Sequence, residues 1–195
     1  ASPHRLGGQR NVLVLFSYHR ALWSENVLRG VESVLNPFSD VTLSYEYMDT
    51  KRLNTPDYRN SLRSIYERKY AHTHFDLIIS VDNDALQLLV ENSRTLFPDI
   101  PVVFCGVNDY APKLHSSRHG VTGVAEAADF ADTLRFALRV RPRTKKILVI
   151  CDHTPTGEGN TREFLSILPL IAPQVAPVLL DKMTYSEMAE ALRQA

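Results

Sequence analysis

The sequence is poor in cysteine: only Cys105 and Cys151 occur among its 195 residues. Two cysteines cannot form a disulfide framework, and both lie at the ends of apolar runs. This position favours two small buried side chains and leaves the redox compartment open. The sequence also lacks an apolar run of about 18 residues, the length that a membrane-spanning helix needs. We therefore expect no transmembrane segment within these residues.

An excess of charge of one sign is missing as well. The 22 lysines and arginines balance 22 aspartates and glutamates, so the formal net charge is +0. Proteins that bind nucleic acid normally carry a basic excess, so this balance argues against a nucleic-acid partner. The hydrophobic fraction of 44% is that of a globular protein with one large domain or two small ones.

What the sequence does contain is a regular alternation of two patterns. Short apolar runs, typical of buried strands, occupy residues 11–17, 41–48, 75–81, 101–105, 120–125, 146–151 and 175–181. Between them, helical spacing of apolar residues predicts helices at 22–35, 56–70, 85–93, 129–140, 161–168 and from about 184. The alternation predicts an α/β fold with mostly parallel sheets. Its rhythm breaks around residues 109–128, which marks a candidate boundary between two lobes.

Polar side chains follow the ends of the expected strands. These tips are residues 17–19, 48–50, 82–84, 106–109, 126 and 152–154. In a parallel sheet the carboxyl ends of the strands line the crevice where ligands bind. A single polar tip is typical of a turn, but six in register support a ligand site as well. Both interpretations stay open at this point.

Phosphate-binding motifs are absent. The segment DHTPTGEGN (152–160) lacks the lysine and Ser/Thr ending of a P-loop and the spacing of a dinucleotide fingerprint. It favours the start of a helix, whose free N–H groups can hold an anionic or polar group. Asp82 and Asp84 suggest a phospho-acceptor site, but the first strand tip lacks the acidic residues that would hold its metal.

Metal-binding and catalytic patterns are absent too. The pairs His72 with His74 and His115 with His119 have no cysteine or carboxylate at a convincing zinc spacing. No G-x-S-x-G elbow occurs, and a serine only two residues from His19 does not readily form a nucleophile–base pair. We therefore expect a protein that is not an enzyme and that needs no cofactor or metal.

Long stretches of the chain resemble a known family. They are VLVLFSYHRALWSENVLRGVESVL, EYMDTKR, FDLIISVDNDALQLL, FPDIPVVFCGVND, TGVAEAADFADTLRFAL and ILVICDHTPTG. Together they resemble the extracytoplasmic sensor domains of bacterial histidine kinases and diguanylate cyclases, which are related to ABC-transporter substrate-binding proteins. The resemblance implies a type I periplasmic binding protein-like fold: two Rossmann-like lobes of three layers that close on a small molecule.

The resemblance also divides the chain. Residues 1–10 become an N-terminal tail, 11–122 the first lobe and 123–195 a partial second lobe. A complete protein of this type needs about 250–300 residues, so we expect an incomplete second lobe. Such a lobe leaves an unpaired sheet edge and uncovered apolar surface, which predicts a homodimer.

The resemblance further implies which residues face the ligand in the cleft between the lobes. On the first lobe they are Ser17, Tyr18, Trp23, Asp49, Thr50, Asn83, Gly106, Asn108 and Asp109. On the second lobe they are Glu126, Asp152, Thr154, Thr156 and Gly157. Gly106 would let the backbone approach closely. Trp23 has two interpretations, a core side chain under the first loop or an aromatic wall of the crevice.

Three functions remain for such a chain. The first is a ligand-sensing domain, anchored to the membrane in its parent protein, in which ligand-induced closure biases the attached output segments. The second is a periplasmic substrate-binding protein of an ABC importer, and the third an α/β enzyme. Asp49, Asp109 and Glu126 can receive a cationic group and the helix start near Thr156 a carboxylate, so an amino acid-like ligand is one expectation.

Overall fold

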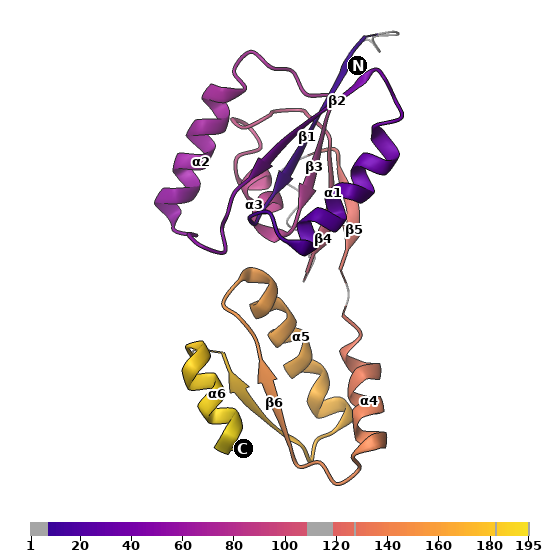
Figure 1. Cartoon of the computed structure of the whole chain (residues 1–195), viewed down its shortest axis with the longest axis vertical. Coiled ribbons are helices and arrows are strands. Elements are labelled where there is room, and N and C mark those ends of the chain that lie inside the picture. Colours follow the sequence, from indigo (N-terminus) through magenta and orange to yellow (C-terminus); the bar gives the residue numbers. More distant parts are fainter. Residues whose placement is uncertain (1–7, 109–118, 127, 182, 195) are drawn as a thin grey trace. The chain divides into compact units, whose positions relative to one another are not determined.

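The structure is a computed structural model that describes residues 8–108, 119–126, 128–181 and 183–194 (Figure 1). The chain divides into two compact units, residues 1–126 (unit 1) and 127–195 (unit 2). The predicted boundary between residues 122 and 123 falls inside the last strand of unit 1. None of the described helices is both long and apolar enough to cross a membrane.

Unit 1 is a five-stranded sheet in the order β2-β1-β3-β4-β5, with every neighbouring pair parallel. Its strands are β1 (Arg10–Phe16), β2 (Val41–Tyr47), β3 (Leu77–Val81), β4 (Val102–Val107) and β5 (Val121–Ala125). Its helices are α1 (Leu22–Leu35), α2 (Pro56–Lys69) and α3 (Asn83–Glu91). The register between β4 and β5 shifts between Cys105 and Val107, which leaves Gly106 unpaired in a bulge.

The apolar runs form strands because the sheet of unit 1 is covered on both faces. Leu13 and Leu15 of β1 pack with α2 and α3, while Val14 and Phe16 pack on the opposite face with Leu28 of α1. All four β1 side chains are 1% exposed or less. The result is the three-layer arrangement predicted from the sequence, with all strands ending along one edge.

Unit 2 is smaller and contains two parallel strands, β6 (Lys146–Ile150) and β7 (Ala176–Leu180). Its helices are α4 (Phe130–Val140), α5 (Pro155–Ile171) and α6 (Tyr185–Gln194). Its core consists of Leu134, Leu168, Ala172 and Val175. Helix α5 extends beyond the predicted span 161–168 at both ends. Thr154 caps its N-terminus and a proline suits its first turn, so the helix starts before its two glycines.

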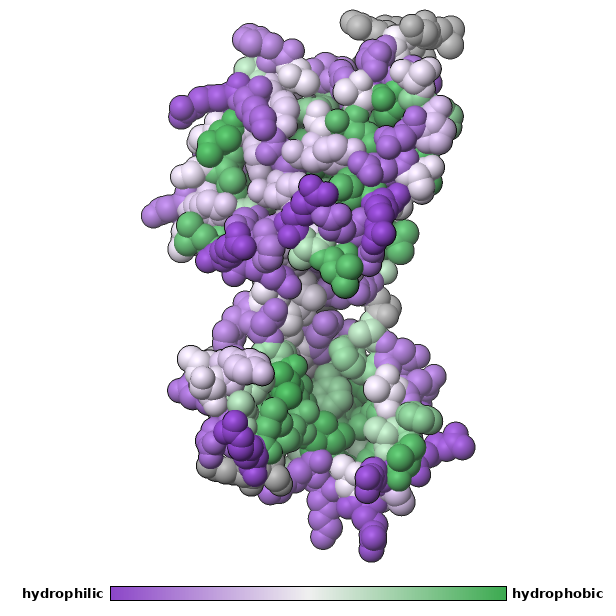
Figure 2. Space-filling view, viewed as in Figure 1, coloured by the Kyte–Doolittle hydropathy of each residue, from purple (hydrophilic) through white to green (hydrophobic). Residues whose placement is uncertain are grey.

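Unit 2 also exposes many large apolar side chains. Figure 2 shows a broad apolar area on the face of this unit that it displays. The exposed large apolar residues of unit 2 are Phe136, Val140, Ile150, Leu170, Val178, Leu179, Met183, Tyr185 and Leu192. Unit 2 thus exposes as many large apolar side chains as the longer unit 1, although it buries far fewer apolar residues.

Candidate functional site

The carboxyl edge of the unit 1 sheet gathers buried polar side chains, which we call the unit 1 tip. Ser17 follows β1, Thr50 follows β2, Asp82 and Asp84 follow β3, and Asn108 follows β4. All five are 5% exposed or less. Buried polar groups almost always have hydrogen-bond partners. The partners of each group therefore show whether it builds the fold or is available to a ligand.

Ser17 and Thr50 are engaged inside the unit. The Ser17 hydroxyl donates to the Val81 carbonyl oxygen and accepts from the Ala85 backbone N–H, both at 2.8 Å. The Thr50 hydroxyl lies 2.8 Å from the Ser17 carbonyl oxygen and beside the Asp84 carboxylate. These bonds tie the ends of β1 and β3 to α3. The structure thus places both predicted contact residues beneath the surface, in a network that supports the tip.

Asn83 and Asn108 form a second connection at this edge. The Asn83 amide donates to the Asn108 carbonyl oxygen at 2.8 Å and accepts from the Asn108 backbone N–H at 3.0 Å. The Asn108 side-chain oxygen Oδ1 is buried and has no hydrogen bond to any described residue. Asn83 therefore holds the loop, and Asn108 offers an unused acceptor. Asp109, the next predicted contact, lies outside the described residues.

Gly106 and Trp23 meet at the tip. Gly106 has a φ of +69°, and a Cβ built on it would lie 2.6 Å from Cη2 of the Trp23 ring. Only glycine allows this approach, because any side chain would collide with the indole. Trp23 is 42% exposed, so one part of the ring packs on β4 while another part is open. The position agrees with an aromatic wall better than with a core side chain.

Asp82 lies against the same backbone. Its Oδ1 is 3.6 Å from the position of a Cβ on Gly106. Asp82 is only 5% exposed and has a φ of +71°, and no hydrogen bond is among the interactions that shift the pKa of its carboxyl. Burial, followed by the negative charges of Glu126 and Asp84, raises the pKa of Asp82 to about 7, and Lys51 opposes the shift. The tip therefore holds a carboxyl that titrates near neutral pH.

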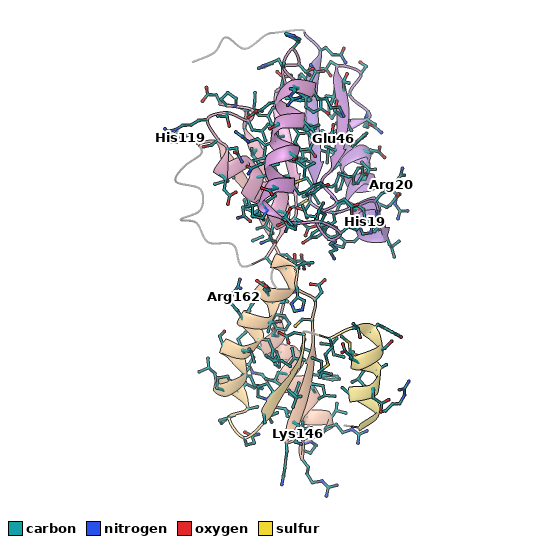
Figure 3. The ribbon with its side chains drawn as sticks, turned by 90° about the vertical axis from the view of Figure 1, so that its left-hand side faces the viewer. His19, Arg20, Glu46, His119, Lys146 and Arg162 are labelled. Atoms are coloured by element: carbon teal, nitrogen blue, oxygen red, sulfur yellow. The ribbon has the colours of Figure 1, made fainter. Side chains whose placement is uncertain are left out.

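The cations of the tip are already paired with residues of the chain. The Lys51 ammonium lies 4.5 Å from the centre of the Tyr18 ring, a cation–π contact. Asp49 accepts from Arg52 at 3.0 Å and lies 3.1 Å from Nδ1 of His19. Figure 3 shows His19 beside Arg20 at the end of unit 1 where β1 finishes. Asp49 is thus less available to a cationic ligand than the sequence suggested.

Unit 2 has its own polar strand end after β6. Asp152 Oδ1 accepts from the Thr154 backbone N–H at 3.1 Å and from its hydroxyl at 2.6 Å. The Thr154 hydroxyl in turn accepts from the Gly157 N–H at 3.1 Å. A Cβ on Gly157 would lie 2.4 Å from the Asp152 carbonyl oxygen. This segment starts a helix as predicted, and Thr156 lies half-buried in its first turn.

Glu126 is placed differently from the expectation. It belongs to unit 1, directly after β5, where its backbone N–H donates to the Val107 carbonyl oxygen at 2.9 Å. Its side chain is exposed. The predicted contact list omitted Asp82 and Lys51. Their position in the sequence could have indicated them. Asp82 directly follows β3, and Lys51 lies shortly after β2.

The described residues contain no group of three or more histidine, cysteine, aspartate or glutamate side chains that could hold a metal ion. The pair His72 and His74, which the sequence did not indicate as a zinc site, gains no further ligand among these residues. His115 lies outside the described part of the chain.

Comparison with known proteins places the fold. No protein-family model and no curated protein matches the sequence, but solved structures share the fold over most of its length. A conserved domain protein from Vibrio cholerae superposes with a TM-score of 0.65 at 18% identity, covering 95% of this chain and 62% of that one. The leucine-binding protein LivK from Thermotoga maritima gives 0.67 at 12%, covering 95% and 53%.

A third neighbour is an ABC domain from Streptococcus pneumonia in complex with L-Trp, with a TM-score of 0.64, 14% identity and coverage of 93% and 60%. This chain therefore spans less than two thirds of each of these structures. The fold is that of type I periplasmic binding proteins, as the resemblance implied.

Proposed function

We propose that the chain is an extracytoplasmic ligand-binding domain of a membrane-bound signal-transduction protein, a histidine kinase or a diguanylate cyclase. The observation that carries this proposal is the composition of the unit 1 tip. Trp23 presents a partly exposed aromatic side chain beside the nearly buried Asp82, and Asn108 presents a buried acceptor without a partner among the described residues. An apolar wall with a few convergent polar groups is the usual composition of a small-molecule site.

The fold neighbours support a small molecule as the ligand. They include an ABC domain in complex with L-Trp, a leucine-binding protein and a solute-binding protein in complex with 3,4-dihydroxybenzoic acid. One architecture thus accepts ligands of different chemistry, because the side chains at the site and not the fold select the ligand. The proposed role in signalling rests on the resemblance of the sequence to sensor domains of histidine kinases and diguanylate cyclases.

Binding without bond-making agrees with the chemistry of the tip. Its most reactive side chain is Cys105, which is half-buried on β4. Burial and the nearby charge of Asp82 raise the pKa of the Cys105 thiol. The thiol therefore stays protonated at neutral pH and is a poor nucleophile. This supports a binding domain in preference to an enzyme.

The proposal is tested by ligand titrations that use Trp23 as the reporter. Trp23 is the single tryptophan of the chain, so a ligand that contacts the tip changes the only indole emission. We expect a saturable change in emission and a higher melting temperature with at least one molecule among leucine, 3,4-dihydroxybenzoate and simple amines, or a higher melting temperature with tryptophan, whose own indole emission leaves only that measurement. If none of these molecules changes either quantity, the unit 1 tip is not a small-molecule site and the proposal fails.

A free substrate-binding protein of an ABC importer is the second candidate. The observation in its favour is that several fold neighbours carry that description, including a solute-binding protein from Rhodopseudomonas palustris. Sequencing the gene on both sides of this segment separates the two. A downstream apolar span followed by a kinase or cyclase domain supports the sensor, and a stop codon after a completed second lobe supports the transport protein.

A further inference from the structure

Resting on the proposed function, we infer that the ligand of the unit 1 tip carries an alkylammonium group, held between the Asp82 carboxyl and the Trp23 ring. Both groups lie against one backbone position. A Cβ on Gly106 would be 2.6 Å from the Trp23 ring and 3.6 Å from Asp82 Oδ1. The tip therefore places a carboxyl oxygen and an aromatic surface within a few ångström of each other.

The Asp82 carboxyl lacks what a buried carboxylate needs. Asp82 is only 5% exposed, and none of the described residues contributes a hydrogen bond that lowers the pKa of its carboxyl. A buried carboxylate without a partner is costly, whereas one paired with a cation is stabilised. The backbone holds the residue in place, because the Asp82 N–H donates to the Cys105 carbonyl oxygen at 2.9 Å. The backbone of Asp82 is therefore fixed beside Gly106, which places its carboxyl where a ligand group could pair with it.

The aromatic surface beside it suits the same chemistry. Trp23 is the best side chain for a cation–π contact, and organic ammonium groups are recognised by aromatic rings together with a carboxylate. Trp23 as a residue is 42% exposed, so part of its surface remains open beside the contact with Gly106. A neutral ligand would use the aromatic surface but would leave the carboxyl unpaired.

The charges around Asp82 also favour a cation. Glu126 after β5 and Asp84 on α3 add negative charge, while Lys51 after β2 adds one positive charge. The charge of Asp82 also raises the pKa of one further titratable group, the Cys105 thiol on β4. Lys51 already contacts the Tyr18 ring. Three carboxyl groups against one lysine leave the tip with a net attraction for a positive ligand group.

The test compares molecules of equal shape and different charge. Choline has the neutral isostere 3,3-dimethylbutan-1-ol, and 2-phenylethylamine has the neutral counterpart 2-phenylethanol. Each is titrated into the chain at pH 8, followed by Trp23 fluorescence and calorimetry. We expect at least one cation to bind ten times or more tightly than its neutral counterpart. We also expect that preference to fall at pH 5.5, where Asp82 takes up a proton.

Two variants locate the effect. Asp82→Asn should lose the tenfold preference at pH 8 and its dependence on pH. Asp40→Asn is the matched control, because Asp40 is an exposed acid paired with Arg10 at the amino end of β1, and it should keep both. A cation preference that survives Asp82→Asn overturns the inference. The comparison of isosteres on the unmodified chain remains decisive if the variant does not fold.

The outcomes also separate this inference from the function on which it rests. Equal or tighter binding of the neutral counterparts, or binding of 3,4-dihydroxybenzoate alone, overturns the alkylammonium assignment and keeps the small-molecule site. Binding of none of these molecules, nor of leucine or tryptophan, overturns both.

Discussion

Asn83 and Asn108 are joined by two hydrogen bonds of 2.8 and 3.0 Å, in which the side-chain amide of Asn83 pairs with both backbone polar groups of Asn108. The pair connects the first residue of α3 to the residue after β4. The Asn83 amide therefore satisfies the backbone N–H and C=O of Asn108, as a neighbouring strand would within a sheet. This relationship predicts different results for the two asparagines.

Asn83→Ala should destabilise unit 1. The substitution removes both bonds and leaves a buried N–H and C=O without partners, which costs about 1–3 kcal/mol. Urea unfolding followed by the fluorescence of Trp23 measures this change, since the only tryptophan lies in unit 1.

Asn108→Ala is the matched comparison. Its side-chain oxygen is buried without a partner, so the free energy of unfolding should change by less than about 0.5 kcal/mol, the range of neutral substitutions. Binding of the best ligand from the titrations should weaken. If stability and binding fall together, Asn108 is a turn residue and not a ligand contact.

Gly106→Ala should displace Trp23. The added methyl group would lie 2.6 Å from the ring on a residue with φ of +69°, so the ring must move and the backbone is strained by about 1–2 kcal/mol. We expect lower stability and a shifted emission maximum. Gly30→Ala is the control, because no atom lies within 4 Å of its Cβ position in α1. It should stabilise the helix by about 0.5–1 kcal/mol. An unchanged emission spectrum for Gly106→Ala would contradict the described contact.

Asp82→Asn should change how stability depends on pH. The pKa of Asp82 is about 7 in the folded chain, above its ordinary value of 3.8, so between pH 4 and 7 the folded state keeps a proton that the unfolded state releases. The stability of the unmodified chain therefore falls as pH rises through this window and stays lower above it. The variant lacks this loss and should be more stable at pH 8 by roughly 2–4 kcal/mol. Parallel curves for the two proteins from pH 4 to 8 would show that Asp82 titrates normally.

Self-association through unit 2 remains a prediction. Leu170 and Tyr185 are 82% and 87% exposed, and exposed apolar surface favours association. Sedimentation equilibrium at increasing concentration should show a mass that rises toward that of a dimer, and Leu170→Glu should lower it. A monomer mass that does not depend on concentration would exclude the dimer.

The fold could be predicted from the sequence because its signals are local. The strands and helices follow from apolar runs and helical spacing, and even the short β5 is visible as GVTGVA. The chemistry of the unit 1 tip could not be predicted from the sequence, because it depends on contacts between residues that are distant along the chain. The pKa of Asp82 depends on Glu126, and the contact of Trp23 with Gly106 joins α1 to β4. Asn108 and Thr50 looked alike as strand tips, and only their hydrogen bonds distinguish them.

The bulge at Gly106 separates the regular part of β4 from the residues that lead into the proposed ligand site. Residues 102–105 pair with β5 in one register, and Val107 resumes the pairing after one unpaired residue. Changes after Gly106 therefore leave the ladder before it undisturbed. A designer who wishes to alter ligand preference can vary the positions that follow the bulge and keep the sheet as a constant framework.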